Sequence, residues 1–172
     1  MTLPVAAASI LLAFGAASAS AADADPDFFA AALCQPAYSM ETATRLYEAA
    51  EKIAKPDTSG LGAAIYHLPA PIHRDGFVTQ DVVFAGTSVG VLLEGDVAAQ
   101  AAERYHLTPE KSHLFGASTL GFARALPDDE QADPEFGLVS AIAREGPALK
   151  GKTLLACEFV SAEDRRALDA LD

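Results

Sequence analysis

Apolar and polar positions recur with two different periods along the chain, and each period predicts one kind of element. From residue 40 to 53, apolar side chains such as Leu46, Tyr47 and Ala50 recur every three to four residues. The charged side chains between them fall on the opposite face, which is typical of an amphipathic helix. Ser39 precedes this run and is a favoured N-cap residue, so the sequence predicts a helix over 40–53.

The middle of the chain changes to a period of two. Val89, Val91 and Leu93 share one side of an extended segment, and a similar apolar alternation precedes them. Small and polar residues between the two segments are typical of a tight turn. Residues 77–93 therefore predict an antiparallel hairpin.

The remaining patterns are shorter. Residues 120–126 and 152–160 favour strands, and Thr108-Pro109-Glu110 favours one short turn of helix. Residues 136–145 are ambiguous, because their apolar positions alternate as in a strand while Asp133-Pro134 and Gly146 frame them as a helix. The framing residues slightly favour the helix.

Together these elements predict an α+β fold with a mostly antiparallel sheet of about four to six strands and helices packed on it. No internal repeat or long linker divides residues 23–172. We therefore expect one domain over 23–172.

The N-terminal residues have the features of a segment that is removed during export. No charged side chain precedes Asp23, residues 5–14 are apolar, and Ala19-Ser20-Ala21 offers a small-residue cleavage site. These features are typical of a secretory signal peptide over residues 1–22, although no Lys or Arg begins it. The alternative is an Ala-rich helix that stays on the protein. We expect a periplasmic or secreted protein with no transmembrane segment in its mature chain.

Export changes the meaning of the two cysteines. Cys34 lies near the predicted mature N-terminus and Cys157 lies near the C-terminus. Cysteine pairs in an oxidising compartment usually form disulfides, so we expect Cys34 and Cys157 to be linked. Two buried free thiols, or one catalytic thiol, are the alternatives.

Charge restricts the partners. Asp and Glu number 24 against 12 Lys and Arg, which gives a formal net charge of -12. Such a chain is repelled by nucleic acid and by anionic lipid, whereas a basic protein is a compatible partner. One stretch concentrates the charge and is a candidate partner-binding loop, although most such loops are only solvated. Its acidic residues are Asp128, Asp129, Glu130, Asp133 and Glu135.

Motifs for catalysis and cofactors are missing from the sequence. It has no G-x-S-x-G elbow, no P-loop and no histidine pair at helical metal-ligand spacing, so we expect no metal and no cofactor. The pattern favours a non-enzymatic binding module of the inhibitor or immunity type. The alternative is a small periplasmic hydrolase whose polar site assembles only in the fold. Its candidate residues are His67, His73, Asp75 and Asp81.

Overall fold

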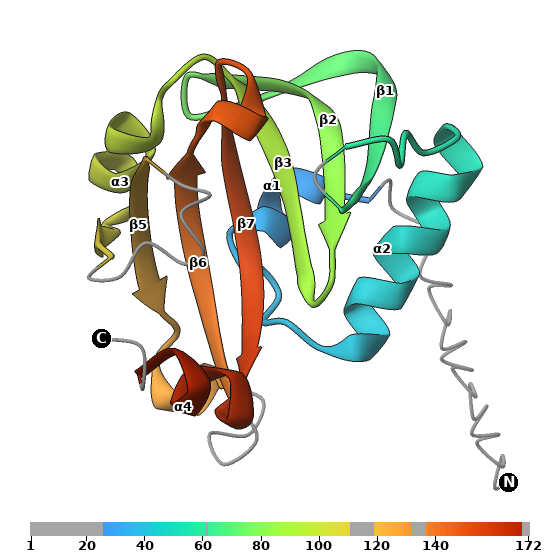
Figure 1. Ribbon diagram of the computed structural model, residues 1–172. Coiled ribbons are helices and arrows are strands. Elements are labelled where there is room, and N and C mark those ends of the chain that lie inside the picture. The colour runs from blue at the N-terminus through green and yellow to red at the C-terminus, as the bar shows by residue number, and fades with distance from the viewer. Residues whose placement is uncertain (1–25, 61, 111–118, 132–136, 170–172) are drawn as a thin grey trace, which may run out of the picture.

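The structure, a computed structural model, describes residues 26–60, 62–110, 119–131 and 137–169. In this part of the chain, four helices accompany one antiparallel sheet of seven strands (Figure 1). The helices are α1 (Phe28–Ala32), α2 (Met40–Ile53), α3 (Ala98–Tyr105) and α4 (Ala162–Asp169). The strands are β1 (Ala64–Arg74), β2 (Phe77–Ala85), β3 (Ser88–Glu94), β4 (Thr108–Pro109), β5 (Leu120–Ala125), β6 (Gly137–Glu145) and β7 (Lys152–Ser161). Two 3-10 turns are η2 (Asp128–Glu130) and η3 (Pro147–Leu149).

The strands lie in the order β1-β2-β3-β7-β6-β5-β4. The predicted α+β class, the hairpin over 77–93 and the helix over 40–53 are confirmed. The expected four to six strands were too few. One reason is β1, whose prolines conceal a strand: the pairing register shifts between His67 and Ile72, so Pro69 and Pro71 fall in the irregular stretch of an edge strand.

The slight preference for a helix over 136–145 was wrong, because residues 137–145 form β6. This strand pairs with β5 on one side and β7 on the other. Pairing on both sides satisfies its backbone groups, and such long-range pairing overrides a weak local preference. The Asp133-Pro134 signal lies outside the described residues.

The expected start of a helical turn at Thr108-Pro109-Glu110 was also wrong, and residues 111–118, into which the turn would continue, lie outside the described residues. Thr108 and Pro109 form β4 and pair with Ala123 and Phe122 of β5. Proline lacks an N–H donor and is tolerated here because β4 is the edge strand.

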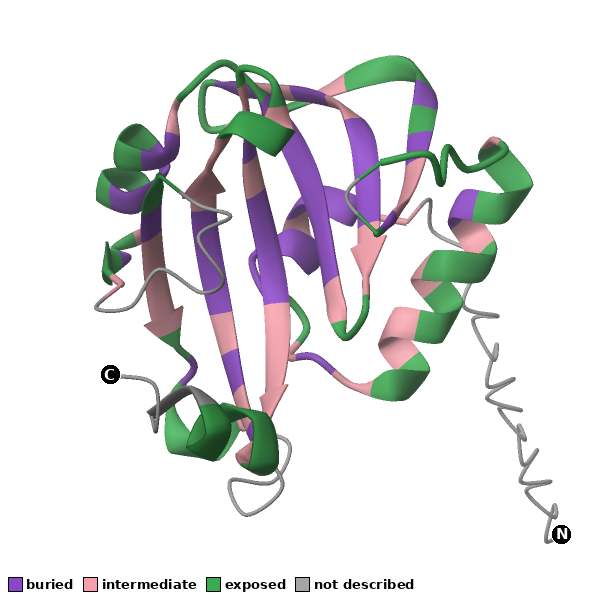
Figure 2. Ribbon diagram, in the orientation of Figure 1, coloured by how far each residue is buried: buried purple, intermediate pink, exposed green. Residues whose placement is uncertain are grey.

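The two faces of the sheet are covered differently. One row of aligned side chains runs from Val82 through Val91 and Leu155 to Ala143. This row joins buried side chains of α1, α2 and α3 in one hydrophobic cluster. On the other face, Leu92 belongs to a smaller cluster that includes no side chain of these helices. Figure 2 shows the buried centre of the sheet and the mostly exposed surfaces of α2 and α4.

The expected disulfide is present. Cys34, just after α1, is bonded to Cys157 of β7 across a sequence separation of 123 residues. Both side chains are buried in the main hydrophobic cluster. Closing a loop of this length restricts the unfolded chain and contributes about 4 to 5 kcal/mol in the chain-entropy model.

Candidate functional site

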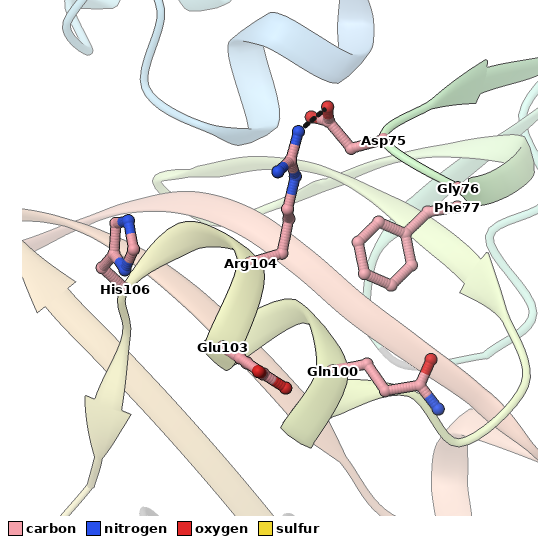
Figure 3. Close-up of a pocket in the computed structure, with 7 residues that line it drawn as sticks. All are labelled: Asp75, Gly76, Phe77, Gln100, Glu103, Arg104 and His106. Carbon is pink, nitrogen blue, oxygen red and sulfur yellow. Dashed lines mark hydrogen bonds and ion pairs between the residues drawn. The ribbon is translucent and has the colours of Figure 1, made fainter.

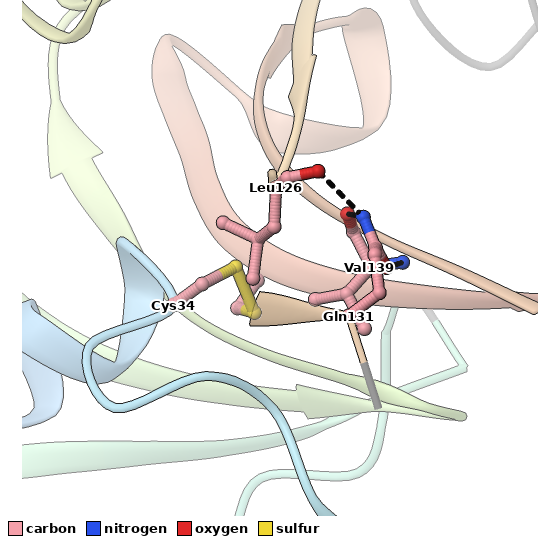
Figure 4. The surroundings of a disulfide bond; sticks show 5 residues. Cys34, Leu126, Gln131 and Val139 are labelled. Carbon is pink, nitrogen blue, oxygen red and sulfur yellow. Dashed lines mark hydrogen bonds between the residues drawn. A yellow bond between two sulfur atoms is a disulfide. The ribbon is translucent and has the colours of Figure 1, made fainter. Parts of the chain in front are cut away.

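Part of the predicted acidic loop forms a turn that hydrogen bonds hold at its base. Leu126 follows β5 and is buried, and its N–H donates to the carbonyl of Val139 in β6 (3.0 Å). The Gln131 side chain closes the turn: its Nε2 donates to the carbonyls of Leu126 (2.8 Å) and Val139 (3.1 Å), and its Oε1 accepts from the Val139 N–H (2.8 Å). Figure 4 shows this clamp beside the disulfide of Cys34. The turn is therefore fixed at its base.

The carboxylates of this turn face solvent. Asp128, Asp129 and Glu130, which we call the acidic turn, form η2 and are all exposed. Among the described residues, none of the three forms an ion pair with a basic side chain. The loop's other predicted members, Asp133 and Glu135, lie outside the described residues.

Helix α4 adds carboxylates at the same end of the sheet (Figure 1). Gly137 at the start of β6 pairs with Ser161 at the end of β7, so α4 begins beside the acidic loop. Ser161 caps the helix, because its Oγ accepts from the Asp164 N–H (3.0 Å). Glu163 and Asp164 are exposed in the first turn, and the exposed Arg165 and Arg166 that follow offset their charge. Glu163 and Asp164 together with the acidic turn make up what we call the acidic end.

The four residues of the hydrolase hypothesis occupy two separate places. His67 and Asp81 pair across β1 and β2, with 2.8 Å between Nδ1 and Oδ1. His73 lies instead opposite Val78, and Asp75 lies in the turn between the strands. At about 3.3 Å per residue, the start of β2 is about 13 Å from Asp81. The structure therefore brings together only the first pair.

Asp81 has a second partner, Lys152 of β7, which sequence reasoning missed. Burial opposes ionisation of Asp81, but hydrogen bonds from Lys152 and His67 outweigh it and hold the pKa of this carboxyl below its usual value. The nearby hydroxyl of Thr79 donates to the carbonyl of Leu92 (2.7 Å). Among the described residues, no hydroxyl or thiol bonds to His67, so the cluster lacks the nucleophile of a triad.

The turn between β1 and β2 borders a hollow of about 510 Å³ against α3 (Figure 3). Asp75 accepts hydrogen bonds there from Arg104 (2.6 Å) and from the Tyr105 hydroxyl (3.2 Å). The Arg104 guanidinium lowers the pKa of Asp75, while burial and the Asp75 charge raise the pKa of Tyr105 to about 12. The charge of Asp75 is therefore matched within the protein, whereas Glu103, which also lines the hollow, is exposed and forms no ion pair with another described residue.

A third charged cluster lies on the face of the sheet away from α1 and α3. Arg144 of β6 forms ion pairs with Glu110 (2.6 Å) and Glu158 (3.0 Å), and all three side chains are largely buried. Burial opposes the charged form of Arg144, but the two carboxylates raise its pKa above the usual value. Gly121 opposite Arg144 leaves room for this cluster, because an added Cβ would collide with Glu110 Oε2. These interactions hold β6 to β7 and to the segment after β4.

Within the described residues, no three His, Cys, Asp or Glu side chains are grouped as metal ligands, and no helix is long and apolar enough to cross a membrane. Of the four histidines in the sequence, His113 lies outside this part of the chain. Comparison with models of protein families, with curated proteins and with solved structures finds no match. The functional argument therefore depends on the chemistry of the sites themselves.

Proposed function

We propose that this protein is an exported, non-enzymatic binding module whose acidic end engages a basic macromolecular partner, as an inhibitor or immunity protein does. One observation carries the proposal. The acidic turn presents three exposed carboxylates without ion-pair partners among the described residues, on a backbone that Gln131 fixes.

Both halves of that observation favour binding. Unmatched carboxylates attract a basic surface, raise its association rate and repel acidic competitors. A turn that is already fixed loses little conformational freedom when a partner docks on it. Asp75, Asp81, Glu110 and Glu158, by contrast, are paired with basic side chains of the protein.

Export is the second part of the proposal. The uncharged, apolar character of residues 1–22 supports a signal peptide, and the Cys34–Cys157 disulfide fits an oxidising compartment. The net charge of -12 disfavours nucleic acid and anionic lipid as partners.

The proposal is tested by capture from the cells that make the protein. A C-terminally tagged chain is recovered from the culture fluid and the envelope fraction, and its intact mass is expected to show a start near Ala22 or Asp23. Proteins bound to it are then compared between low and high salt. We expect a basic partner that is released as ionic strength rises.

A pair of variants with equal net charge locates the interaction. Asp128→Asn, Asp129→Asn and Glu130→Gln neutralise the acidic turn, whereas the control neutralises three exposed carboxylates at the other end of the sheet, Glu94, Asp96 and Glu103. Capture is expected to fall at least tenfold in the first variant and less than twofold in the control. Equal losses of capture in the two variants would assign the interaction to net charge alone. Capture that changes neither with salt nor in either variant would overturn the proposal.

A further inference from the structure

An apolar groove lies between the first half of α2 and the tip of the β2–β3 hairpin, which Figure 1 shows side by side. Its volume is about 310 Å³, and its walls include Tyr38, Met40, Tyr47, Phe84 and Val89. Pockets for small organic ligands start at about this size, so the groove fits one large side chain rather than an extended molecule.

Aromatic contacts support the walls of the groove, but the walls are incompletely covered. Tyr47 packs edge-on against Phe84 and Tyr66, with ring centroids 5.3 and 5.9 Å apart, and Tyr38 stacks on Phe159. Met40 is nevertheless 67% exposed and Tyr47 is 36% exposed, so both offer apolar surface to a ligand. The hydroxyl of Tyr66, under this wall, is buried and finds no hydrogen-bond partner among the described residues.

The groove and the acidic end lie toward the same end of the sheet, because Ser88 at the hairpin tip pairs with Glu158 and Gly137 pairs with Ser161 near the end of β7. Phe159, on which Tyr38 stacks, pairs with Val139, and Gln131 clamps Val139 at the base of the acidic turn. The hairpin tip joins the same region, because the Thr87 hydroxyl donates to the carbonyl of Phe159 (2.5 Å). One partner surface can therefore contact both features.

Charge decides what kind of molecule fits. Along α2, the exposed carboxylates of Glu41, Glu48 and Glu51 outnumber the exposed basic side chains of Arg45 and Lys52, so the helix beside the groove carries a net charge of -1. A second copy of this chain would bring another -12 of charge and would be repelled. A segment with Lys or Arg on both sides of one large apolar residue is complementary to the groove and to its surroundings.

We infer that the groove receives a single large apolar side chain from a basic segment of the protein partner. The inference rests on the proposed function, because it assigns an anchoring pocket to the same partner. Binding energy at protein interfaces concentrates in such anchors, with charged residues around them.

The inference is tested with capped peptides of sequence Lys-Arg-Gly-X-Gly-Arg-Lys, in which X is Leu, Trp or Ala, followed by NMR on the isotopically labelled full chain. The Leu and Trp peptides are expected to bind about tenfold more tightly than the Ala peptide, as burial of one large apolar side chain gives. Binding of these two peptides should shift the amide NMR signals of Tyr47, Ala64 and Val89. Equal affinity for the three peptides would overturn the inference.

Two variants on the same helix supply the matched comparison. Met40→Ser removes an exposed groove wall and is expected to reduce the preference for Leu over Ala to less than threefold. Ile53→Ser removes a similarly exposed apolar side chain at the other end of α2, outside the groove, and should leave the preference unchanged. Equal effects of the two substitutions would contradict the inference.

Other occupants give distinct results. Self-association in sedimentation that Met40→Ser abolishes would assign the groove to a second copy. Groove amides that differ between the full chain and a chain starting at Asp23 would assign it to the N-terminal segment. Neutralising the acidic turn should weaken the binding of all three peptides by the same factor. If it does not, while the Leu preference persists, the proposed function fails and the groove assignment stands.

Discussion

Two turns at opposite ends of the sheet use their carboxylates differently. At the end formed by the β1–β2 turn and α3, Asp75 accepts hydrogen bonds from Arg104 and Tyr105. At the other end, Asp128, Asp129 and Glu130 have no ion-pair partner among the described residues, although their turn is well anchored. The first arrangement uses charge to hold the protein together. The second keeps charge available for another molecule, so exposed charge is informative only after its internal partners are known.

The comparison predicts that the disulfide and the Gln131 hydrogen bonds, and not the carboxylates, stabilise the acidic end. Replacing Cys34 and Cys157 together with Ala removes the crosslink next to the Gln131 clamp. We expect a loss of about 4 kcal/mol in the free energy of unfolding, measured by urea denaturation, since the unfolded chain regains the freedom of a very long loop. Reduction of the wild-type protein should give a similar loss. A change below about 1 kcal/mol would contradict the prediction.

The internally matched charges should give a different response, which depends on pH. Asp81→Asn removes a buried carboxylate held by Lys152 and His67, and we expect a loss of about 2 kcal/mol at neutral pH. The folded pKa of Asp81 lies below its unfolded value of about 3.9. Its contribution is therefore complete above that value and is lost as pH falls through the folded pKa.

Denaturation at several pH values checks this sign. The difference between wild type and Asp81→Asn is expected to shrink steadily below about pH 4, where the wild-type carboxyl takes up its proton. A difference that grows in acid would mean that the pKa of Asp81 is raised rather than lowered.

Gln131 tests how the acidic turn itself is held. Gln131→Met keeps the length of the side chain but removes all three hydrogen bonds to Leu126 and Val139, so we expect a loss of about 1 to 2 kcal/mol. Gln131→Glu should be at least as harmful, because a carboxylate would face two carbonyl oxygens. Hydrogen exchange at Val139 should accelerate in both variants. Unchanged exchange there would show that the clamp does not hold the turn.

Local signals were the predictable part of this fold. Ser39 caps α2 with its side chain, as expected from its position before an amphipathic run, and the 77–93 hairpin follows from its alternation and turn. The disulfide was predictable because two cysteines and a predicted export signal leave few alternatives. Strand β6 was not predictable, because its local pattern fits two structures and only its pairing with β5 and β7 decides between them.

The sites were harder to predict than the fold for the same physical reason. The acidic residues stand together in the sequence, whereas Lys152 reaches Asp81 across 71 positions and Gly121 makes room for Glu110 only after β5 pairs with β6. No sequence pattern marks Gln131, because its role is to form hydrogen bonds with two backbone segments that only the fold brings together. The apolar groove likewise requires α2 to lie beside the hairpin tip.

The smallest expected effect is the most direct test of the comparison. Neutralising Asp128, Asp129 and Glu130 together should change the free energy of unfolding by less than about 0.5 kcal/mol, because these side chains stabilise nothing within the described part of the protein. The change should be slightly stabilising at low salt, where removing like charges from a protein of net charge -12 relieves repulsion, and should vanish at high salt. Asp75→Asn provides the contrast, since it should lower the melting temperature by removing the partner of Arg104. If the acidic-turn variant instead loses more than about 1 kcal/mol in the free energy of unfolding, these carboxylates stabilise the fold. The acidic turn and the β1–β2 turn would then use their carboxylates in the same way.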